Sequence, residues 1–150
     1  KIRKFTMAPV ERSTVANATP ETIWKTCFEE MNFETWDPDV TELIDVSGGC
    51  EDGTTFTFVM KDSGMKINQT LSGVKKNESL TFSGTFLAVK VIGIITLTPE
   101  GSDKTKIDYS FDMGGCVGSI MKNLNQKSVV GGTEGGLANI VSLSEEAQQK

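Results

Sequence analysis

The sequence predicts an α+β domain in which an antiparallel sheet lies between two helical regions. Between residues 54 and 113, apolar and polar side chains alternate with a period of two, which is typical of strands with one buried face. On either side of this stretch the apolar residues recur at helical spacing. The 150 residues are expected to form one domain, residues 1–150, large enough to build a core without disulfides or metals.

A first helix is predicted to begin near residue 20. Thr19 can cap it with its hydroxyl, Pro20 needs no amide partner in the first turn, and Glu21 faces the positive end of the helix dipole. Its apolar face consists of five residues at helical spacing: Ile23, Trp24, Cys27, Phe28 and Met31. Pro38 prevents the helix from continuing, so a short second helix and a strand are expected around it.

The middle of the chain predicts a series of strands joined by short turns. The apolar sides of the runs are Phe56, Phe58 and Met60; Met65, Ile67 and Leu71; Leu80, Phe82 and Phe86; and Ile107, Tyr109, Phe111 and Met113. Residues 91–97 are apolar on both faces, so the pattern does not define which side is buried. The turns are short and rich in Gly, Asp and Lys, which indicates antiparallel hairpins.

The C-terminal region, residues 118–147, is predicted to be mainly helical and to pack across the sheet. Its middle contains four glycines, each costing about 1 kcal/mol relative to alanine inside a helix. These are Gly131, Gly132, Gly135 and Gly136. Three explanations stay open: close packing of the helix backbone, room for a ligand or a kink, and a break between two helices.

Composition excludes several classes of function. A net charge of −5, with 15 Lys and Arg against 20 Asp and Glu, disfavours nucleic acid as a partner. No apolar run is long enough for an integral membrane segment, and the N-terminal residues lack the apolar core of a signal peptide. Cys27, Cys50 and Cys116 are few and widely spaced, and the chain has no His. We therefore expect free thiols, no metal and no cofactor, and a reducing, cytoplasmic location.

Three motifs carry a resemblance to a known group of proteins. They are residues 18–24 (Ala-Thr-Pro-Glu-Thr-Ile-Trp), residues 36–38 (Trp-Asp-Pro) and residues 109–115 (Tyr-Ser-Phe-Asp-Met-Gly-Gly). With the order of elements, they resemble the START-like or SRPBCC superfamily, in its polyketide cyclase/dehydrase and lipid-transport group, which includes Bet v 1-like proteins. The resemblance implies a helix-grip fold: a curved seven-stranded antiparallel sheet around a long C-terminal helix, with two short helices after strand 1 and an apolar cavity inside.

The resemblance also implies a set of ligand-binding residues. They are the apolar side chains expected to face the cavity, together with Trp36, which the family places near the cavity mouth: Phe28, Met31, Trp36, Phe58, Met60, Met65, Ile67, Phe82, Phe86, Tyr109, Phe111, Met113, Met121 and Leu124. For each one, ordinary core packing is the alternative interpretation, because cavity lining and core are chemically alike in a sequence.

The function expected from the resemblance is binding or transport of a hydrophobic or amphipathic small molecule, such as a lipid, sterol or polyketide, without catalysis, by a monomer or weak homodimer. The alternative is a polyketide cyclase or dehydratase acting in the same cavity. Its candidate acid–base residues are Tyr109, Glu34, Asp37 and Lys90, although no specific catalytic motif is present. A regulatory partner-binding protein is a third possibility, which no exposed aromatic run in the sequence singles out.

Overall fold

A single sheet of seven antiparallel strands dominates the computed structural model, which describes residues 9–86, 88–114 and 126–150. The strand order is β1-β7-β6-β5-β4-β3-β2, so every neighbour except the β1–β7 pair is consecutive in the chain. The strands are β1 (Val10–Ala16), β2 (Val40–Ile44), β3 (Thr55–Met60), β4 (Lys66–Lys75), β5 (Ser79–Phe86), β6 (Val89–Pro99) and β7 (Thr105–Gly114). The predicted antiparallel hairpins are confirmed.

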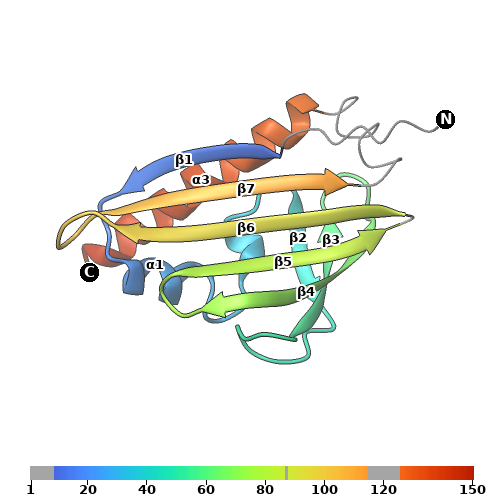
Figure 1. Cartoon of the computed structure of the whole chain (residues 1–150), viewed down its shortest axis with the longest axis horizontal. Helices are drawn as coiled ribbons and strands as arrows, with labels where there is room; N and C mark the ends of the chain where they lie inside the picture. Colours follow the sequence, from blue (N-terminus) through green and yellow to red (C-terminus); the bar gives the residue numbers. More distant parts are fainter. Residues whose placement is uncertain (1–8, 87, 115–125) are drawn as a thin grey trace.

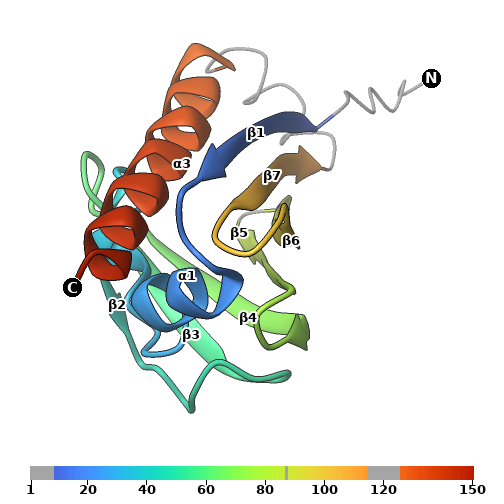
Figure 2. The ribbon, with the colours of Figure 1, turned by 90° about the vertical axis from the view of Figure 1, so that its left-hand side faces the viewer.

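Three helices complete the described part of the chain. A short α-helix, α1 (Pro20–Cys27), and a 3-10 helix, η1 (Phe33–Thr35), lie between β1 and β2, and the long helix α3 (Gln126–Gln148) follows β7. The sheet curves around α3, which packs against β1, β7 and α1 (Figures 1 and 2). The predicted α+β helix-grip fold, with two short helices after strand 1, is confirmed.

Helix α1 starts as predicted but ends earlier. The Thr19 hydroxyl accepts a hydrogen bond from the Thr22 amide at 3.2 Å, and Pro20 occupies the first turn. The helix ends at Cys27, where the expected apolar face would have run on to Met31. Met31 instead has a φ of 55°, outside the helical region. The Asn32 side chain donates to the Thr26 carbonyl at 2.9 Å, which satisfies one of the free carbonyls at this end.

The strand of ambiguous pattern, β6, buries its odd-numbered residues. Val91, Ile95 and Leu97 are buried, whereas Ile94 is 39% exposed on the opposite face. The buried side is the one that faces α3 and the helical layer, because Ile95 and Leu97 belong to the same core cluster as Leu137 and Ile140 of α3. Tertiary packing therefore determines which face of β6 is buried, which the apolar pattern alone did not define.

An aromatic cluster fills the core between η1 and the sheet. Phe33 is completely buried, and its ring lies within 6.3 Å, centroid to centroid, of five other aromatic rings. These belong to Phe28, Trp36, Phe56, Phe58 and Phe82. The short 3-10 helix thus contributes the residue that joins α1, the segment before β2 and the sheet.

The glycines of α3 allow close packing, and the helix is continuous through them. A Cβ at Gly135 would lie 3.2 Å from the Pro38 ring, and a Cβ at Gly136 would lie 3.5 Å from the Trp36 ring. A Cβ at Gly132 would fall on the carboxylate of Asp39. The glycines therefore admit residues 36–39, the segment between η1 and β2. The alternative of a break between two helices is wrong for residues 126–148.

A matched pair of glycine substitutions tests this packing. Gly131 has nothing within 4 Å of its would-be Cβ, so Gly131→Ala is expected to raise the free energy of unfolding by about 0.5–1 kcal/mol through helix propensity. Gly132→Ala should gain less, because the Asp39 carboxylate has to move. Urea denaturation of the two variants measures the difference, and equal gains would contradict the close approach.

Candidate functional site

A cavity of about 410 Å³ lies between the concave face of the sheet and helix α3. Its volume falls in the range of roughly 300–1,000 Å³ that small-molecule sites occupy. Strands β2 to β7, the β3–β4 turn, the segment before β2 and one face of α3 all contribute lining residues. The fold therefore surrounds this space with side chains from almost every element after η1.

Eight of the residues expected at a ligand site line the cavity. They are Phe58, Met60, Met65, Ile67, Phe82, Tyr109, Phe111 and Met113. Exposure orders them by depth: Phe58, Phe82 and Tyr109 are at most 5% exposed, whereas the methionines are half-buried. The ring of Phe82 forms part of the floor and lies directly over Gly93 of β6, where any Cβ would overlap it.

Four others lie elsewhere. Phe28 packs in the aromatic cluster, and half-buried Phe86 ends β5; neither is among the residues that line the cavity. Met31 lines a separate surface depression of about 310 Å³, together with Glu34. Trp36 is discussed below. Met121 and Leu124 lie outside the described residues, as does the first part of the helix predicted over 118–147.

Trp36 does not sit at the cavity mouth, where it was expected. Its side chain is 0% exposed, and its indole N–H donates to the Cys27 carbonyl at 3.0 Å. The Asn139 side chain of α3 donates to the Trp36 carbonyl at 2.9 Å. The ring packs edge-on against Tyr109 at 6.1 Å, so Trp36 stands one layer behind the cavity wall. A large ring with one polar atom is well suited to this buried, hydrogen-bonded position.

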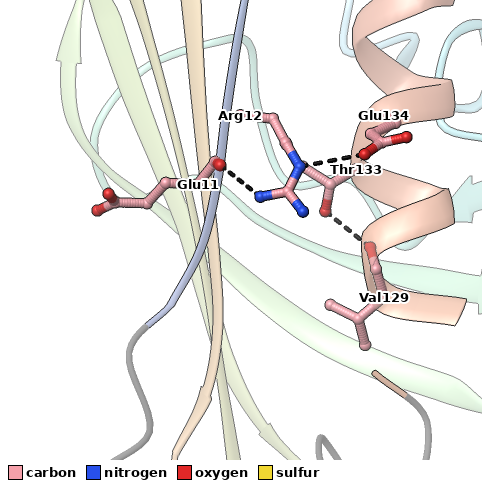
Figure 3. A network of polar contacts seen from close by, with 5 residues as sticks. All are labelled: Glu11, Arg12, Val129, Thr133 and Glu134. Carbon is pink, nitrogen blue, oxygen red and sulfur yellow. Dashed lines mark hydrogen bonds and ion pairs between the residues drawn. The ribbon is translucent and has the colours of Figure 1, made fainter. Parts of the chain in front are cut away.

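An ion pair ties the cavity-lining part of α3 to the edge of the sheet (Figure 3). The Arg12 guanidinium of β1 donates to Glu134 at 3.1 Å and to the Glu11 carbonyl at 2.8 Å. The neighbouring Thr133 is 4% exposed, lines the cavity and donates to the Val129 carbonyl at 2.8 Å. Small side chains on α3 thus leave space above the sheet while the exposed face of the helix is held to β1.

The sequence did not predict that a group of acidic side chains would line part of the cavity wall. Three aspartates line the cavity, Asp37 and Asp39 before β2 and Asp62 in the β3–β4 turn. Asp39 and Asp62 are exposed and Asp37 is half-buried, so the carboxylates lie toward the open end. Among the described lining residues there is no lysine or arginine. The open end of an apolar cavity is therefore acidic.

Burial and nearby negative charge raise the pKa values of Asp37 and Asp39. Burial raises the pKa of Asp37 to about 6, a rise that Asp39 adds to and that the hydrogen bond from the Asp39 amide, at 3.0 Å, opposes. The pKa of Asp39 is raised by burial and by Asp62, against a lowering effect of Lys61. The pKa of Tyr109 is raised well above 10 by burial and then by Asp37 and Asp39, so its hydroxyl is neutral.

Of the four candidate acid–base residues, the structure brings two together. Tyr109 and Asp37 line the same cavity, and the negative charge of Asp37 contributes to the raised pKa of Tyr109. Glu34 lines the separate depression, and Lys90 is exposed on the opposite face of β6. Within the described ranges no group of three acidic or cysteine side chains could hold a metal ion, and Cys27 and Cys50 are free thiols.

Gln69 of β4 also lines the cavity, although it was not among the predicted site residues. Its position in the sequence nevertheless carries a clear signal. It interrupts the apolar side of its strand between Ile67 and Leu71. It is 2% exposed, and neither its amide oxygen nor its amide nitrogen has a hydrogen-bond partner in the part of the chain that the structure describes. Its amide lies against Gly84 of β5, where a Cβ would be 2.9 Å from the amide nitrogen.

Replacing Gln69 by methionine is expected to raise the free energy of unfolding. Methionine has nearly the same length and volume, and the substitution removes a buried amide that costs about 1–3 kcal/mol when it is not hydrogen-bonded. Guanidinium denaturation of the ligand-free protein measures the gain. Gln69→Glu serves as the opposite change and should destabilise; a loss of stability in Gln69→Met would show that the amide is satisfied in solution.

The sequence comparison assigns the chain to a family. The fold and its cavity define a helix-grip protein of the START-like class. Residues 7–145 match the profile of the family described as polyketide cyclase / dehydrase and lipid transport, and the chain belongs to that family. No curated protein sequence matches the chain. No helix in the described ranges is both long and apolar enough to cross a membrane.

Solved structures share the fold at low sequence identity. XoxI from Bacillus cereus has a TM-score of 0.71 at 17% identity, covering 91% of this chain and 94% of that chain. A protein from Mesorhizobium loti has a TM-score of 0.65 at 16% identity, covering 94% and 96%. Norcoclaurine synthase from Thalictrum flavum, in complex with dopamine and hydroxybenzaldehyde, has a TM-score of 0.71 at 15% identity, covering 95% and 88%. The Bet v 1-like fold predicted for this chain is thereby confirmed.

Proposed function

We propose that this protein binds a small amphipathic molecule reversibly in the cavity between the sheet and α3, without converting it. The observation that carries the proposal is the cavity of about 410 Å³, with apolar side chains on its floor and polar groups toward its open end. Such a combination of apolar walls and a few placed polar groups is typical of ligand sites. The membership in a family that includes lipid-transport proteins, and a structural neighbour solved with small aromatic ligands, support it.

A cavity-filling variant with a matched control tests the proposal. Val91 of β6 lines the cavity and is 7% exposed, whereas Val15 of β1 is 47% exposed. Val91→Phe adds a ring inside the cavity, and Val15→Phe makes the same chemical change outside it. The neutral fluorescent probe N-phenyl-1-naphthylamine is expected to bind wild type and Val15→Phe equally and Val91→Phe at least about ten-fold more weakly, a difference of about 1.4 kcal/mol.

Two results would refute the proposal. The first is equal probe binding by all three proteins, which would place the probe outside the cavity. The second is the absence of binding tighter than about 1 mM, roughly −4 kcal/mol, by the probe and by decanoate. Thermal denaturation of Val91→Phe must accompany the titration, because overpacking a filled interior typically costs about 1–3 kcal/mol.

An acid–base enzyme is the second candidate, and one observation favours it. Asp37, with a pKa near 6, and the neutral hydroxyl of Tyr109 line the same cavity, and a carboxyl group that titrates near neutral pH suits general acid–base catalysis. With a candidate polyketide substrate, Tyr109→Phe and Asp37→Asn would each have to reduce turnover by about 10²–10⁴ while substrate binding is retained. Unconverted ligand in the wild-type protein favours the binding function.

A further inference from the structure

The charge at the open end of the cavity is of one sign. Asp37, Asp39 and Asp62 line it, and no cationic side chain does so within the described residues. Lys61 is the cation that acts on Asp39, and its effect on the pKa of Asp39 is smaller than those of burial and Asp62. From α3 the described lining residues are Ser128, Val129, Gly132 and Thr133, none of which is charged. The carboxylates are therefore not neutralised by the wall around them.

The first two carboxylates are held in place by their backbone. Trp36 is anchored in the core, and the Pro38 ring packs against Gly135 of α3. The Asp39 amide donates to Asp37 Oδ1 at 3.0 Å, and the Lys61 amide donates to the Asp39 carbonyl at 2.9 Å. The Asp39 carboxylate lies against the α3 backbone at Gly132. Such fixed carboxylates can bind a cation with little loss of side-chain entropy.

Gln69 provides a second, independent indication of a ligand. It is 2% exposed, it lines the same cavity, and both polar atoms of its amide are without a partner in the described structure. A buried amide of this kind is costly unless it is hydrogen-bonded. A polar atom on a bound molecule would supply the missing partner at the floor, while the carboxylates act at the open end.

The wall between these two polar regions is aromatic and apolar. Phe58, Phe82 and Phe111 line it together with the ring of Tyr109. Adjacent rings in this set meet edge-on, with Phe58 and Phe82 centroids 5.6 Å apart and Tyr109 and Phe111 centroids 6.5 Å apart. This surface fits an aromatic or alkyl body and carries no cationic side chain that would attract an anion.

We propose that the ligand of this cavity is a protonated amine with an apolar, preferably aromatic, body, whose ammonium group is bound by Asp37 and Asp39 and whose far end carries a hydrogen-bonding group for Gln69. The inference rests on the proposed binding function and narrows it to one charge class. An acidic entrance attracts cations and repels fatty acids and other anionic amphiphiles. A neutral ligand would leave the half-buried carboxylate of Asp37 without a counter-charge.

Three probes of equal size separate charge from apolar binding: 4-phenylbutylamine, 4-phenylbutan-1-ol and 4-phenylbutanoate. Calorimetric titration at pH 7.5, where the amine is protonated and the aspartates are ionised, compares them on the same protein. The amine is expected to bind at least about ten-fold more tightly than the alcohol, as charge-assisted hydrogen bonds do relative to neutral ones, and the carboxylate most weakly.

Matched variants assign the preference to the two aspartates. Asp39→Asn and Asp37→Asn should each reduce the ratio of amine to alcohol affinity by about five-fold or more while alcohol binding is kept. Asp103→Asn, in the exposed turn between β6 and β7, removes the same charge and should leave the ratio unchanged. Adding a para-hydroxyl to the amine probe should strengthen its binding to wild type but not to Gln69→Met.

The outcomes distinguish a failure of the amine assignment from a failure of the proposed binding function. Equal binding of the amine and the alcohol, or stronger binding of the carboxylate, would overturn the amine assignment and leave the binding function standing. An amine preference that Asp103→Asn lowers as much as Asp39→Asn does would also overturn it, because the effect would then come from net charge. If none of the three probes binds although N-phenyl-1-naphthylamine does, the inference fails and the binding function stands; if N-phenyl-1-naphthylamine and decanoate do not bind either, both fail.

Discussion

Phe33→Ala is expected to lower the free energy of unfolding by about 3–5 kcal/mol, the usual cost of removing a fully buried aromatic ring. Phe33 is 0% exposed and is surrounded by five aromatic rings, so its removal leaves a void that no neighbour can fill without moving. Urea denaturation followed by circular dichroism measures the loss. Because Phe33 packs against the two rings on the cavity floor, Phe58 and Phe82, ligand binding should weaken as well.

Phe111→Ala is the matched control for this prediction. It is the same chemical change at a half-buried ring that already borders the cavity and whose aromatic neighbour is Tyr109. Its cost should be clearly smaller, because part of its surface faces space and not packed atoms. A loss below about 1 kcal/mol for Phe33→Ala, or equal losses in the two variants, would show that Phe33 is not the centre of the core.

Asp37→Asn is expected to stabilise the protein at pH 7.5 by about 2–3 kcal/mol. Folding raises the pKa of this carboxyl from 3.8 to about 6, so the folded protein favours the protonated form. The stabilisation from that proton is complete below about pH 4 and is lost as the pH rises through 6. Asparagine imitates the protonated acid at every pH and keeps the hydrogen bond from the Asp39 amide.

The pH profile of stability tests this sign. Thermal or urea denaturation of wild type and Asp37→Asn between pH 3 and 8 should give stabilities that converge at the acid end, separate as the pH rises from about 4 through 6, and stay apart by a constant amount above that. Asp103→Asn, which removes the same charge in an exposed turn, should give no comparable separation. A variant less stable than wild type at pH 7.5 would mean that the Asp37 charge is compensated in the folded protein.

The fold was predictable because its strands each bury one face and its turns are short. Where a strand is apolar on both sides, as over residues 91–97, only the position of α3 decides the buried face. The end of α1 was not predictable from spacing, since Met31 continues the apolar series although the helix already ends at Cys27. The glycines of α3 could be recognised as unusual, but their partner, the segment 36–39, is remote in sequence.

The site was predictable only in its apolar half. Alternation selects Phe58, Phe82 and Phe111 because it reports which side of a strand is buried, whether or not a cavity lies there. It cannot distinguish a wall residue from a core residue, so Trp36 was expected one layer too far out. Asp37 and Asp39 follow a helix end, where polar residues are ordinary. Gln69 was visible as a polar residue at an apolar position of β4.

The cavity walls and the aspartates at its open end come from different parts of the chain, which affects how substitutions can change ligand binding. The apolar volume is built by strands that also form the core, whereas two of the three charges stand on the four residues from Trp36 to Asp39 and the third on the turn at Asp62. The apolar volume of the cavity and the charge at its open end are therefore encoded in separate parts of the chain. If the proposed amine binding holds, substitutions at positions 37, 39 and 62 would change the charge class of the ligand without altering the strands that form the cavity, which makes this framework suitable for engineered receptors.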